Sequence, residues 1–320
     1  MLIAIDHGNY ACKIASKDGL APSGDSFVSG LSEHSVRPPL AADAIEWGGT
    51  HWTLTESRLP YQWDKTKSEH FFILTLFAIA RELRVSGEQP YETDIDLAVG
   101  LPPEHYSVLK DRFAKYFQRG AVKYQYNGAP VFVDIRQVFV YPQAYAAVAP
   151  RARSLTSTPR LFVIDIGGMT TDILLLRNGK PDLQFCRSLE LGVITMNNEI
   201  IGKVSAEHGI LIEDDHIASI IQGRETILTA PVIQTVWEST QRHTDAILNK
   251  LRELQVDLRS TPAIFIGGGA ALFKQYIEGS PMVAKAEFIT DTRANAIGYL
   301  MLASSQIQKL SQKAGANGNA

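Results

Sequence analysis

The chain has 320 residues, of which 45% are hydrophobic and 20% are charged, and its formal net charge is −3. This length suffices for one large domain or two medium domains, each with its own core. The near-neutral balance lacks the basic excess that is typical of nucleic-acid-coating surfaces, so we expect no direct contact with nucleic acid and none with a membrane. The two cysteines, Cys12 and Cys186, are too few for a disulfide framework or for a metal site of their own.

The sequence also predicts a cytoplasmic protein. Its longest apolar run, residues 71–80, contains a threonine and has about half the length that a bilayer-spanning helix needs. The chain begins directly with a strand-like run at residues 2–5, and no basic segment or long apolar stretch precedes it.

The first 140 residues are predicted to form strands and two helices. Short apolar runs bounded by turns predict strands at residues 2–6, 10–16, 27–29 and 95–99. The Asn127-Gly128 turn predicts a hairpin over residues 122–140. Apolar periodicity predicts helices over residues 68–85 and 104–117. Residues 31–66 are rich in Pro, Gly and Trp and are predicted to be irregular, apart from a hairpin at Trp47-Gly48-Gly49.

A second set of elements begins near Pro159. Apolar runs predict strands at residues 161–165, 172–176, 183–190 and 263–266. Helices are predicted from Val193 and over residues 233–254. The order of strand, Asp-x-Gly turn, strand, strand and helix repeats the order of the first half after about 150 residues. That spacing is too long for a solenoid repeat and indicates a duplicated domain.

The first candidate site lies in the turn of residues 3–9, which read Ile-Ala-Ile-Asp-His-Gly-Asn. Asp6 ends a strand, and Gly8 and Asn9 form a tight turn that can present backbone N–H groups to a phosphate. Gly8 lets the backbone approach without a Cβ clash, and Lys13 supplies a point charge. The alternative is an ordinary turn between two strands.

The second candidate site, residues 163–172, reads Val-Ile-Asp-Ile-Gly-Gly-Met-Thr-Thr-Asp. The amides of Gly167 and Gly168 and the hydroxyls of Thr170 and Thr171 suit phosphate oxygens, while Asp165 suits Mg²⁺ held through its water shell. Two such turns at the starts of two repeated units predict a clamp that holds a phosphate chain from both sides.

A third glycine-rich turn occupies residues 264–273, Ile-Phe-Ile-Gly-Gly-Gly-Ala-Ala-Leu-Phe. Gly267, Gly268 and Gly269 between a buried strand and a helix permit flat contact with a large ring or with an α-phosphate. The alternative is a close-packed turn from strand to helix.

Together the three motifs resemble the phosphate 1, phosphate 2 and adenosine motifs of the actin/Hsp70/sugar-kinase ATPase superfamily. The run from Asp165 to Asp172 is similar to the Hsp70-type Asp-x-Gly-Gly-x-Thr-x-Asp pattern. Within the superfamily the chain is most similar to the ParM/StbA group of bacterial plasmid-segregation actins. The segments that carry this resemblance are residues 2–9, Gly100-Leu101-Pro102, Val140-Tyr141-Pro142-Gln143 and Leu191-Gly192.

The resemblance implies an α/β fold of the actin-like ATPase type, with two duplicated RNase H-like domains around a nucleotide cleft. Domain I would comprise residues 1–150, with an insert subdomain at about 31–66, and would be completed by a C-terminal helix at 293–313. Domain II would comprise residues 151–292, and residues 314–320 would form a disordered tail.

The resemblance also implies roles for single residues. Asp6 and Asp165 would bind Mg²⁺ through water, and Asp172 would help to hold the ion or its loop. Gln143 occupies the position that orients the attacking water, and a neutral Gln implies slow hydrolysis; the alternative is a surface residue that caps the next helix. His7 is read as a loop variant. The residues that would contact ATP, with GTP left open, are Gly8, Asn9, Lys13, Gly167, Gly168, Thr170, Thr171, Gly267, Gly268 and Gly269.

The function implied is that of a slow ATPase which forms filaments and drives plasmid segregation. Its partners would be further copies of itself and a DNA-binding adaptor of the ParR type. Two alternatives remain open. One is a small-molecule kinase, for which the sequence carries no sugar-kinase signature. The other is a non-polymerising scaffold ATPase of the same superfamily.

Several other clusters have simpler readings. Asp214, Asp215 and His216 are predicted to be the acidic first turn of a helix rather than a metal site. The apolar stripe of Phe71, Phe72, Leu76 and Phe77 is predicted to be core. Trp47, Trp52 and Trp63 fit either a filament contact or a small hydrophobic core of their own.

Overall fold

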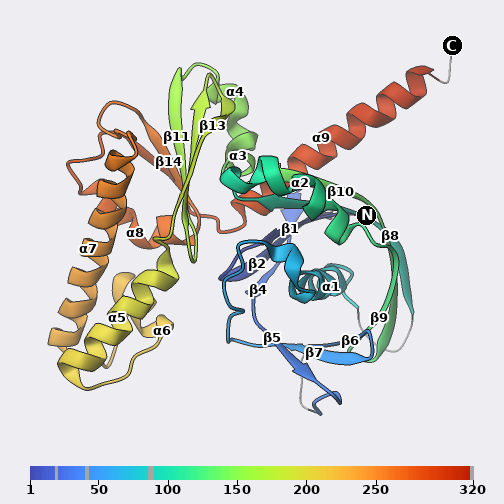
Figure 1. Ribbon diagram of the computed structural model, residues 1–320, viewed down its shortest axis with the longest axis horizontal. Helices are drawn as coiled ribbons and strands as arrows, with labels where there is room; N and C mark the ends of the chain where they lie inside the picture. Colours follow the sequence, from blue (N-terminus) through green and yellow to red (C-terminus); the bar gives the residue numbers. More distant parts are fainter. Residues whose placement is uncertain (19–20, 40–42, 86–89, 318–320) are drawn as a thin grey trace. The chain divides into compact units, whose positions relative to one another are not determined.

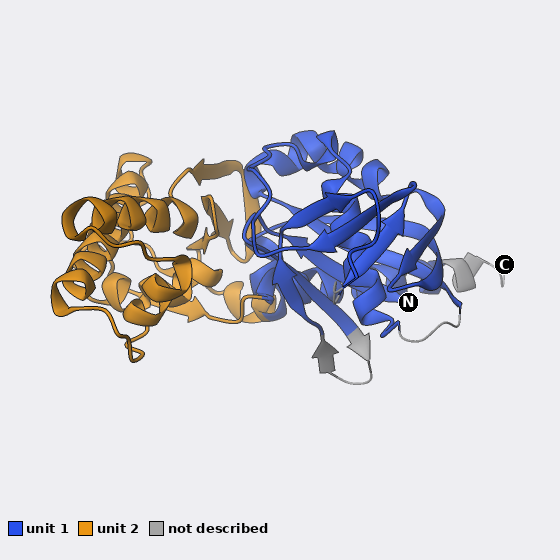
Figure 2. Cartoon of the chain, turned by 90° about the horizontal axis from the view of Figure 1, so that it is seen from below, with its two compact units in different colours: residues 1–150, 293–320 blue, residues 151–292 orange. Residues whose placement is uncertain are grey.

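The computed structural model describes residues 1–18, 21–39, 43–85 and 90–317. The chain divides into two compact units, one of residues 1–150 with 293–320 and one of residues 151–292 (Figure 2). We call them unit 1 and unit 2. Each is built on its own mixed sheet with helices (Figure 1), so the predicted α/β fold class is confirmed.

Among the described residues, unit 1 contains a ten-stranded sheet in the order β3-β2-β1-β8-β10-β9-β6-β7-β5, with β4 paired to β2. Its strands are β1 (Leu2–His7), β2 (Ala11–Asp18), β3 (Ala21–Ser23), β4 (Ser26–Val28), β5 (Leu31–His34), β6 (Ala44–Trp47), β7 (Thr50–Leu54), β8 (Tyr91–Leu101), β9 (Gly120–Tyr126) and β10 (Ala129–Pro142). The strands β1, β8 and β10 run parallel, whereas β1 with β2 and β9 with β10 form antiparallel hairpins.

Helices cover both faces of this sheet around β1 and β8. Because side chains alternate along a strand, Ile3 and Ile5 face α1 (His70–Glu82) and α2 (Pro103–Phe117), whereas Ala4 faces α9 (Ala294–Asn317). The stripe of Phe71, Phe72, Leu76 and Phe77 on α1 is completely or almost completely buried, which confirms that it is core. The remaining short helices of unit 1 are η1 (Lys65–Lys67), α3 (Tyr145–Val148) and η2 (Ala149–Arg151), whose last residue belongs to unit 2.

The segment after β4 differs from the prediction of an irregular insert. The hairpin at residues 47–50 is confirmed, but β5, β6 and β7 extend the main sheet, because β6 pairs with the edge of β9. Trp47 and Trp52 pack against the core of unit 1 instead of forming a small core of their own. Trp63 remains 52% exposed. A free edge on β9 and the alternating apolar residues of the hairpin account for the difference.

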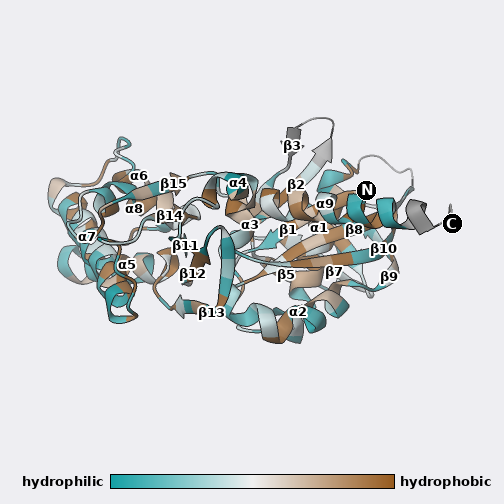
Figure 3. Cartoon of the chain, turned by 90° about the horizontal axis from the view of Figure 1, so that it is seen from above, coloured by the Kyte–Doolittle hydropathy of each residue, from teal (hydrophilic) through white to brown (hydrophobic). Residues whose placement is uncertain are grey.

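Unit 2 contains a five-stranded sheet in its described residues, in the order β13-β12-β11-β14-β15. Its strands are β11 (Arg160–Ile166), β12 (Thr171–Arg177), β13 (Lys180–Leu189), β14 (Ala263–Ile266) and β15 (Ala286–Ile289). Its helices are α4 (Ala152–Leu155), α5 (Val193–His208), α6 (Asp214–Ile221), α7 (Ala230–Glu253) and α8 (Gly268–Glu278). Hydrophobic and hydrophilic residues alternate along α5 and α7 (Figure 3), and their apolar faces pack on one face of the sheet.

The two sheets share a common plan. In unit 1 a central strand, β1, lies between an antiparallel partner, β2, and two successive parallel strands, β8 and β10. In unit 2 the strand β11 lies between the antiparallel β12 and the parallel strands β14 and β15. The penultimate residue of each central strand is an aspartate, Asp6 or Asp165, and a glycine turn follows, so the predicted repeat corresponds to a repeated topology.

Helix α9 extends further than the sequence suggested. It runs to Asn317 and therefore includes residues 314–317, for which a disordered tail was predicted; residues 318–320 lie outside the described residues. Continuing an existing helix adds a hydrogen bond for each residue that is fixed, which favours the extra turn. In the described part of the chain, no helix is both long and apolar enough to cross a membrane.

Candidate functional site

In unit 1 the pairing register of the first hairpin brings Asp6 and Lys13 together. The two residues are directly opposite each other on β1 and β2, and Nζ of Lys13 lies 3.6 Å from Oδ2 of Asp6. Asp6 is only 4% exposed. A buried carboxylate is costly unless it is paired, so the ion pair with Lys13 offsets part of the cost of burying Asp6.

The turn that follows requires glycine at position 8. A Cβ there would lie 2.7 Å from Nζ of Lys13 and 2.7 Å from the carbonyl oxygen of Ala11. The N–H of Gly8 donates to the carbonyl of Asp6 (3.0 Å), and its carbonyl accepts from the hydroxyl of Ser29 (2.6 Å). This N–H is used within the turn, and a contact between Gly8 and a phosphate stays a prediction. The role of Gly8 is to let Lys13 approach.

Gln143 belongs to the same cluster. It follows β10, its backbone N–H donates to the carbonyl of Leu101 (2.8 Å), and its side-chain Nε2 donates to Oδ1 of Asp6 (2.8 Å). The alternative that Gln143 is an exposed helix-capping residue is wrong, since Gln143 is 9% exposed. The next residue, Ala144, has φ of 62°, and its N–H donates to the side chain of Asn295 on α9 (3.0 Å). This strained turn, held by α9, positions Gln143.

His7 is part of the core of unit 1. It is the last residue of β1, it is completely buried, and its ring stacks on Phe117 with the centroids 4.9 Å apart. Its Nε2 hydrogen-bonds to Oγ1 of Thr75 (2.8 Å). Burial, reinforced by the positive charge of Lys65, lowers the pKa of His7 well below its usual value, so the ring is neutral. The prediction of a loop variant is therefore wrong: the side chain faces the core.

In unit 2 the register brings together two carboxylates. Asp165 on β11 and Asp172 on β12 are directly opposite each other and are 8% and 6% exposed. The hydroxyl of Thr170 donates to Oδ2 of Asp172 (3.1 Å). Two carboxylates on facing strand positions form a donor set that a divalent cation could use.

The loop between these aspartates is fixed from both sides. The N–H of Gly167 donates to the carbonyl of Thr170 (2.8 Å), which closes a tight turn. The first backbone N–H groups of α5 donate to the carbonyls of Gly167 and Gly168, at 3.1 and 2.7 Å. A Cβ on Gly192, just before α5, would lie 2.3 Å from the carbonyl oxygen of Gly168. Helix α5 therefore packs closely under the loop and determines its conformation.

Thr171 is completely buried, and its hydroxyl donates to the carbonyl of Leu191 (2.6 Å). As the first residue of β12 it points toward the segment that enters α5, and its contact with a phosphate stays a prediction. Its hydrogen bond helps to hold that segment beside the loop.

The three glycines before α8 have three different roles. Gly267 has φ of 89°, and a Cβ there would lie 2.5 Å from Oδ1 of Asp165. Gly268 is exposed, and no atom lies within 4 Å of its Cβ position, so it leaves open space at the start of α8. Gly269 is buried, and a Cβ there would lie 2.3 Å from the side chain of Ile166, so glycine allows close packing of α8 on β11. Contact between Gly269 and adenosine stays a prediction.

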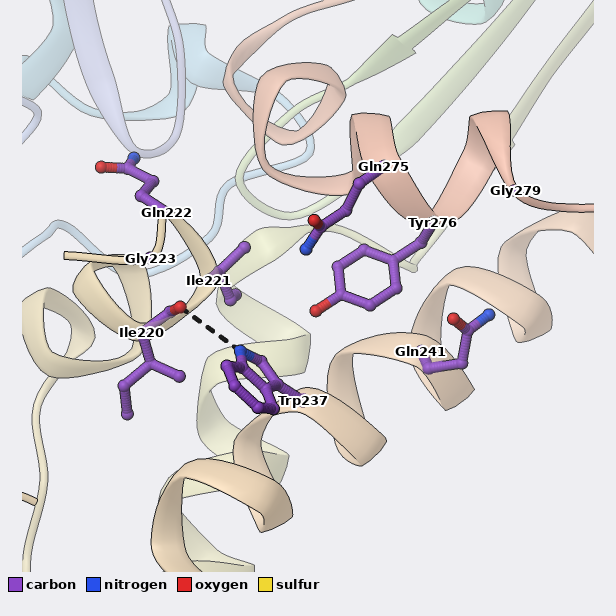
Figure 4. Close-up of a pocket in the computed structure, with 9 residues that line it drawn as sticks. All are labelled: Ile220, Ile221, Gln222, Gly223, Trp237, Gln241, Gln275, Tyr276 and Gly279. Carbon is purple, nitrogen blue, oxygen red and sulfur yellow. Dashed lines mark hydrogen bonds between the residues drawn. The ribbon is translucent and has the colours of Figure 1, made fainter. Parts of the chain in front are cut away.

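Two adjoining hollows lie beside α8 in unit 2. One, of about 350 Å³, is lined in part by Ala271 and Leu272 in the first turns of α8 and by Gln222 at the end of α6. The other, of about 590 Å³, shares Gln222 with it and is bounded by Trp237 and Tyr276 (Figure 4). Both contain aromatic or aliphatic walls with amide side chains, a lining that suits a planar polar ring.

The residues present fit Mg²⁺ rather than a metal with several protein ligands. In the described ranges no group of three or more His, Cys, Asp or Glu side chains is placed to hold an ion. Mg²⁺ keeps several of its waters and uses one or two carboxylates together with substrate phosphates. The facing pair Asp165 and Asp172 matches that donor set.

The predicted acidic turn at Asp214 is confirmed, because His216 and the preceding Glu213 form a capping box at the start of α6.

Three residues near these loops were missed by the sequence reading. Ser29 holds the carbonyl of Gly8, Asn295 holds Ala144, and Nζ of Lys65 donates to the carbonyl of His7. Each is distant in sequence from the residue that it contacts and lies outside any motif. No signal in a single sequence identifies them.

Comparison with known proteins identifies the family in both halves of the chain. Residues 4–145 match the model "Actin like proteins N terminal domain", and residues 163–279 match "Archaeal actin homologue MreB-like, C-terminal". No curated protein sequence matches the chain.

Solved structures of actin homologues share the fold over nearly the whole chain. Ta0583, an archaeal actin homologue in complex with ADP, has a TM-score of 0.73 at 17% identity, covering 95% of this chain and 99% of that one. A ParM filament from Clostridium botulinum has a TM-score of 0.72 at 19% identity, with coverage of 95% and 99%. The apo ParM protein of pSK41 has a TM-score of 0.69 at 15% identity, with coverage of 97% and 98%. With both aspartate hairpins and both family models in agreement, the chain belongs to the actin-like ATPase superfamily.

Proposed function

We propose that this protein binds one Mg-ATP through the two aspartate hairpins, hydrolyses it slowly and forms filaments under nucleotide control. We further propose that the filaments segregate low-copy DNA through a DNA-binding adaptor of the ParR type. The observation that carries the proposal is the duplicated hairpin, in which a buried aspartate ends a central strand and a glycine turn follows. A binding site repeated in two units suits a ligand with a chain of similar groups, such as a triphosphate.

Charge distribution assigns different tasks to the two hairpins. Asp165 and Asp172 would hold Mg²⁺ through its water shell, with Asp6 as a further contact to that shell, and Lys13 would contact a phosphate oxygen. The ion would neutralise charge that develops on the phosphates during transfer. The loop of Gly167 and Gly168, rigidly held by α5, would keep phosphate contacts in place with little reorganisation.

Gln143 would orient the attacking water. Its side-chain nitrogen donates to Asp6, so its Oε1 atom remains available to accept a hydrogen bond from the attacking water. An amide cannot take up that proton at neutral pH, so Gln143 positions the nucleophile without acting as a general base. Slow turnover follows, which suits an enzyme whose hydrolysis times the life of a polymer.

The base of the nucleotide would occupy the hollow beside the first turns of α8. Its lining on α8 begins at Ala271, three residues after Gly268, and its volume of about 350 Å³ is within the range of small-ligand sites. Gln222 and Gln275 line it, and amide side chains hydrogen-bond with the edge of a purine through both a donor and an acceptor.

Filament formation is supported by the solved structures that share this fold. They include the ParM filament from Clostridium botulinum, an AlfA filament from a B. subtilis plasmid and an Alp12 filament, with TM-scores of 0.72, 0.62 and 0.62. A net charge of −3 favours an indirect link to DNA through an adaptor over direct coating of the DNA.

Negative-stain electron microscopy of the purified chain, with and without Mg-ATP, tests the proposal. Filaments that form with ATP and disappear as phosphate is released are the expected result. Single particles in both conditions would contradict it. Phosphorylation of a sugar or an acid without assembly would instead indicate a small-molecule kinase, and ATP hydrolysis without either would indicate a scaffold ATPase.

A further inference from the structure

A short helical segment of unit 1 is locked in place next to the first hairpin. Asp64 precedes the 3-10 helix η1, is only 4% exposed and caps it, accepting hydrogen bonds from the N–H (3.0 Å) and the hydroxyl (2.7 Å) of Thr66. The same carboxylate forms an ion pair with Arg112 of α2. Hydrogen bonds with Thr66 and the charge of Arg112 lower the pKa of Asp64 despite its burial, so Asp64 is ionised.

Contacts on the other side of η1 make the segment rigid. The hydroxyl of Tyr116 on α2 donates to the carbonyl of Ser68 (2.7 Å) and accepts from the N–H of Phe72 (2.8 Å). Arg119 forms an ion pair with Glu69 at 2.7 Å. Residues 64–69 are therefore fixed in place by two side chains of α2, Arg112 and Tyr116, and by Arg119 just after its end.

These contacts hold the side chain of Lys65 next to the turn that contains Gly8. Nζ of Lys65, the first residue of η1, donates to the carbonyl of His7, immediately before Gly8. It also lies 5.1 Å from the ring centroid of Phe71. Burial raises the pKa of the neighbouring Cys12 to about 11, while the charges of Lys13 and Lys65 act in the opposite direction. The two lysines therefore lie close to the same few residues of the hairpin.

The charges of the first hairpin indicate why a second lysine is needed. Lys13 lies 3.6 Å from Asp6, so these two charges balance, and Gln143 adds none. A turn with no net charge attracts an anionic phosphate poorly. Lys65 places a second ammonium beside this turn, and an ammonium has three donor hydrogens, so a bond to His7 is compatible with a bond to a phosphate oxygen.

We propose that Lys65 is a second phosphate-binding cation of the nucleotide site, which contacts the terminal phosphate of ATP and so distinguishes ATP from ADP. The inference rests on the proposed function of the first hairpin. Because Lys65 belongs to a segment fixed to α2, loss of the terminal phosphate on hydrolysis removes a contact between the nucleotide and that segment. Lys65 is thus the residue through which unit 1 responds to hydrolysis.

The test measures affinity for Mg-ATP and Mg-ADP by calorimetry in three variants of the full chain. Lys65→Gln removes the charge and keeps most of the side-chain length, and Lys65→Arg restores a cation. Lys67→Gln is the matched control, because Lys67 is a lysine in the same η1 helix but is exposed. Thermal unfolding without nucleotide shows whether each variant is folded.

The expected result is a loss of about tenfold in ATP affinity for Lys65→Gln, with a smaller loss for ADP, because one charge-assisted hydrogen bond is removed. Lys65→Arg should recover most of the affinity, and Lys67→Gln should bind as the wild type does. Wild-type ATP binding in Lys65→Gln, an equal loss for ATP and ADP, or an equal loss in Lys67→Gln would overturn the assignment of Lys65. If the wild type itself bound no nucleotide, the proposed function would fail, and with it this inference.

Discussion

Asp6 and Asp165 end equivalent strands, yet their neighbours differ in charge. Asp6 faces Lys13 at 3.6 Å and accepts from Gln143 at 2.8 Å, whereas Asp165 faces a second carboxylate, Asp172. The first hairpin therefore pairs a carboxylate with a cation, whereas the second places two carboxylates opposite each other. At the residue scale, this difference is the basis for proposing a phosphate contact in unit 1 and a metal contact in unit 2.

The variant Asp165→Ala tests the metal assignment. Without this carboxylate Mg²⁺ loses a principal contact, and we expect steady-state ATP hydrolysis to fall at least about a hundredfold, with filaments either stable or absent. Asp257→Ala is the control, because Asp257 is an exposed aspartate of unit 2 that pairs with Arg259 at 3.0 Å. Phosphate release at the wild-type rate in Asp165→Ala would show that the assignment is wrong.

Gly267 and Gly268 form a matched pair for testing the turn before α8. In Gly267→Ala the new Cβ would meet Oδ1 of Asp165 at 2.5 Å, and φ of 89° is unfavourable for alanine, so we expect a loss of about 1–3 kcal/mol in the free energy of unfolding. Gly268→Ala meets no atom within 4 Å and should change stability by less than about 0.5 kcal/mol. Urea denaturation without nucleotide measures both. Equal effects would contradict the geometry of this turn.

His243 predicts a dependence of stability on pH. Burial lowers the pKa of His243, and this effect outweighs the opposite effect of the Glu199 carboxylate 3.8 Å away. Below a pH of about 6.5 the unfolded chain therefore binds a proton that the folded chain does not, and stability falls as the pH decreases. In His243→Leu the decrease in the free energy of unfolding between pH 7 and pH 5 should be smaller than in the wild type, by up to about 1.4 kcal/mol per pH unit. An unchanged slope in urea titrations would show that this ring does not contribute.

At the scale of elements, the sequence predicted what depends on neighbours in the chain. The hairpins at Asp6 and Asp165, the Asn127-Gly128 turn and the strand of residues 263–266 all follow from local apolar runs and turn residues. It did not predict the extension of the sheet by β5 to β7, because that depends on the edge of β9, more than 60 residues away in sequence. Pairing partners at such separations leave no signal in one sequence.

The candidate site divides in the same way. The sequence motifs identified three turns that contain glycine, but the reason for each glycine depends on the residue that lies next to it in space. Gly8 accommodates Lys13, Gly267 accommodates Asp165, and Gly269 packs on Ile166. The burial of Thr171 likewise follows from the path of the chain into α5. The sequence located the loops; the contacts within them required the fold.

Helix α9 is attached to unit 1 through a close crossing with α3. A Cβ on Gly298 would lie 1.9 Å from the carbonyl oxygen of Ala146, so Gly298→Ala forces the two helices apart and should destabilise the fold by about 1–3 kcal/mol. It should also weaken ATP hydrolysis, because Asn295 of α9 holds the turn after Gln143.

The control for this crossing is Gly202→Ala, in the interior of α5, where no atom lies within 4 Å of the new Cβ. Removing glycine from a helix interior should stabilise the protein by about 0.5–1 kcal/mol. Opposite signs for the two substitutions in thermal unfolding are the expected pattern. Stabilisation by both would show that α9 and α3 do not meet closely.

At the scale of the whole molecule, duplication explains why two weak motifs together carry a specific function. A glycine turn after a buried strand is common, and either hairpin by itself would be compatible with a structural turn. Two hairpins of the same topology, one beside a lysine and one with two facing carboxylates, are the observation on which the proposed phosphate and metal contacts rest. The family models cover the hairpin of each unit separately, at residues 4–145 and 163–279.

The most direct test of this account is the stoichiometry of Mg-ATP binding, measured by calorimetry for the wild type, Asp6→Ala and Asp165→Ala. If both hairpins bind the same nucleotide, as we propose, the wild type should bind one ATP per chain and each variant should lose at least about tenfold in affinity. Two nucleotides per chain, or wild-type affinity in either variant, would contradict the account.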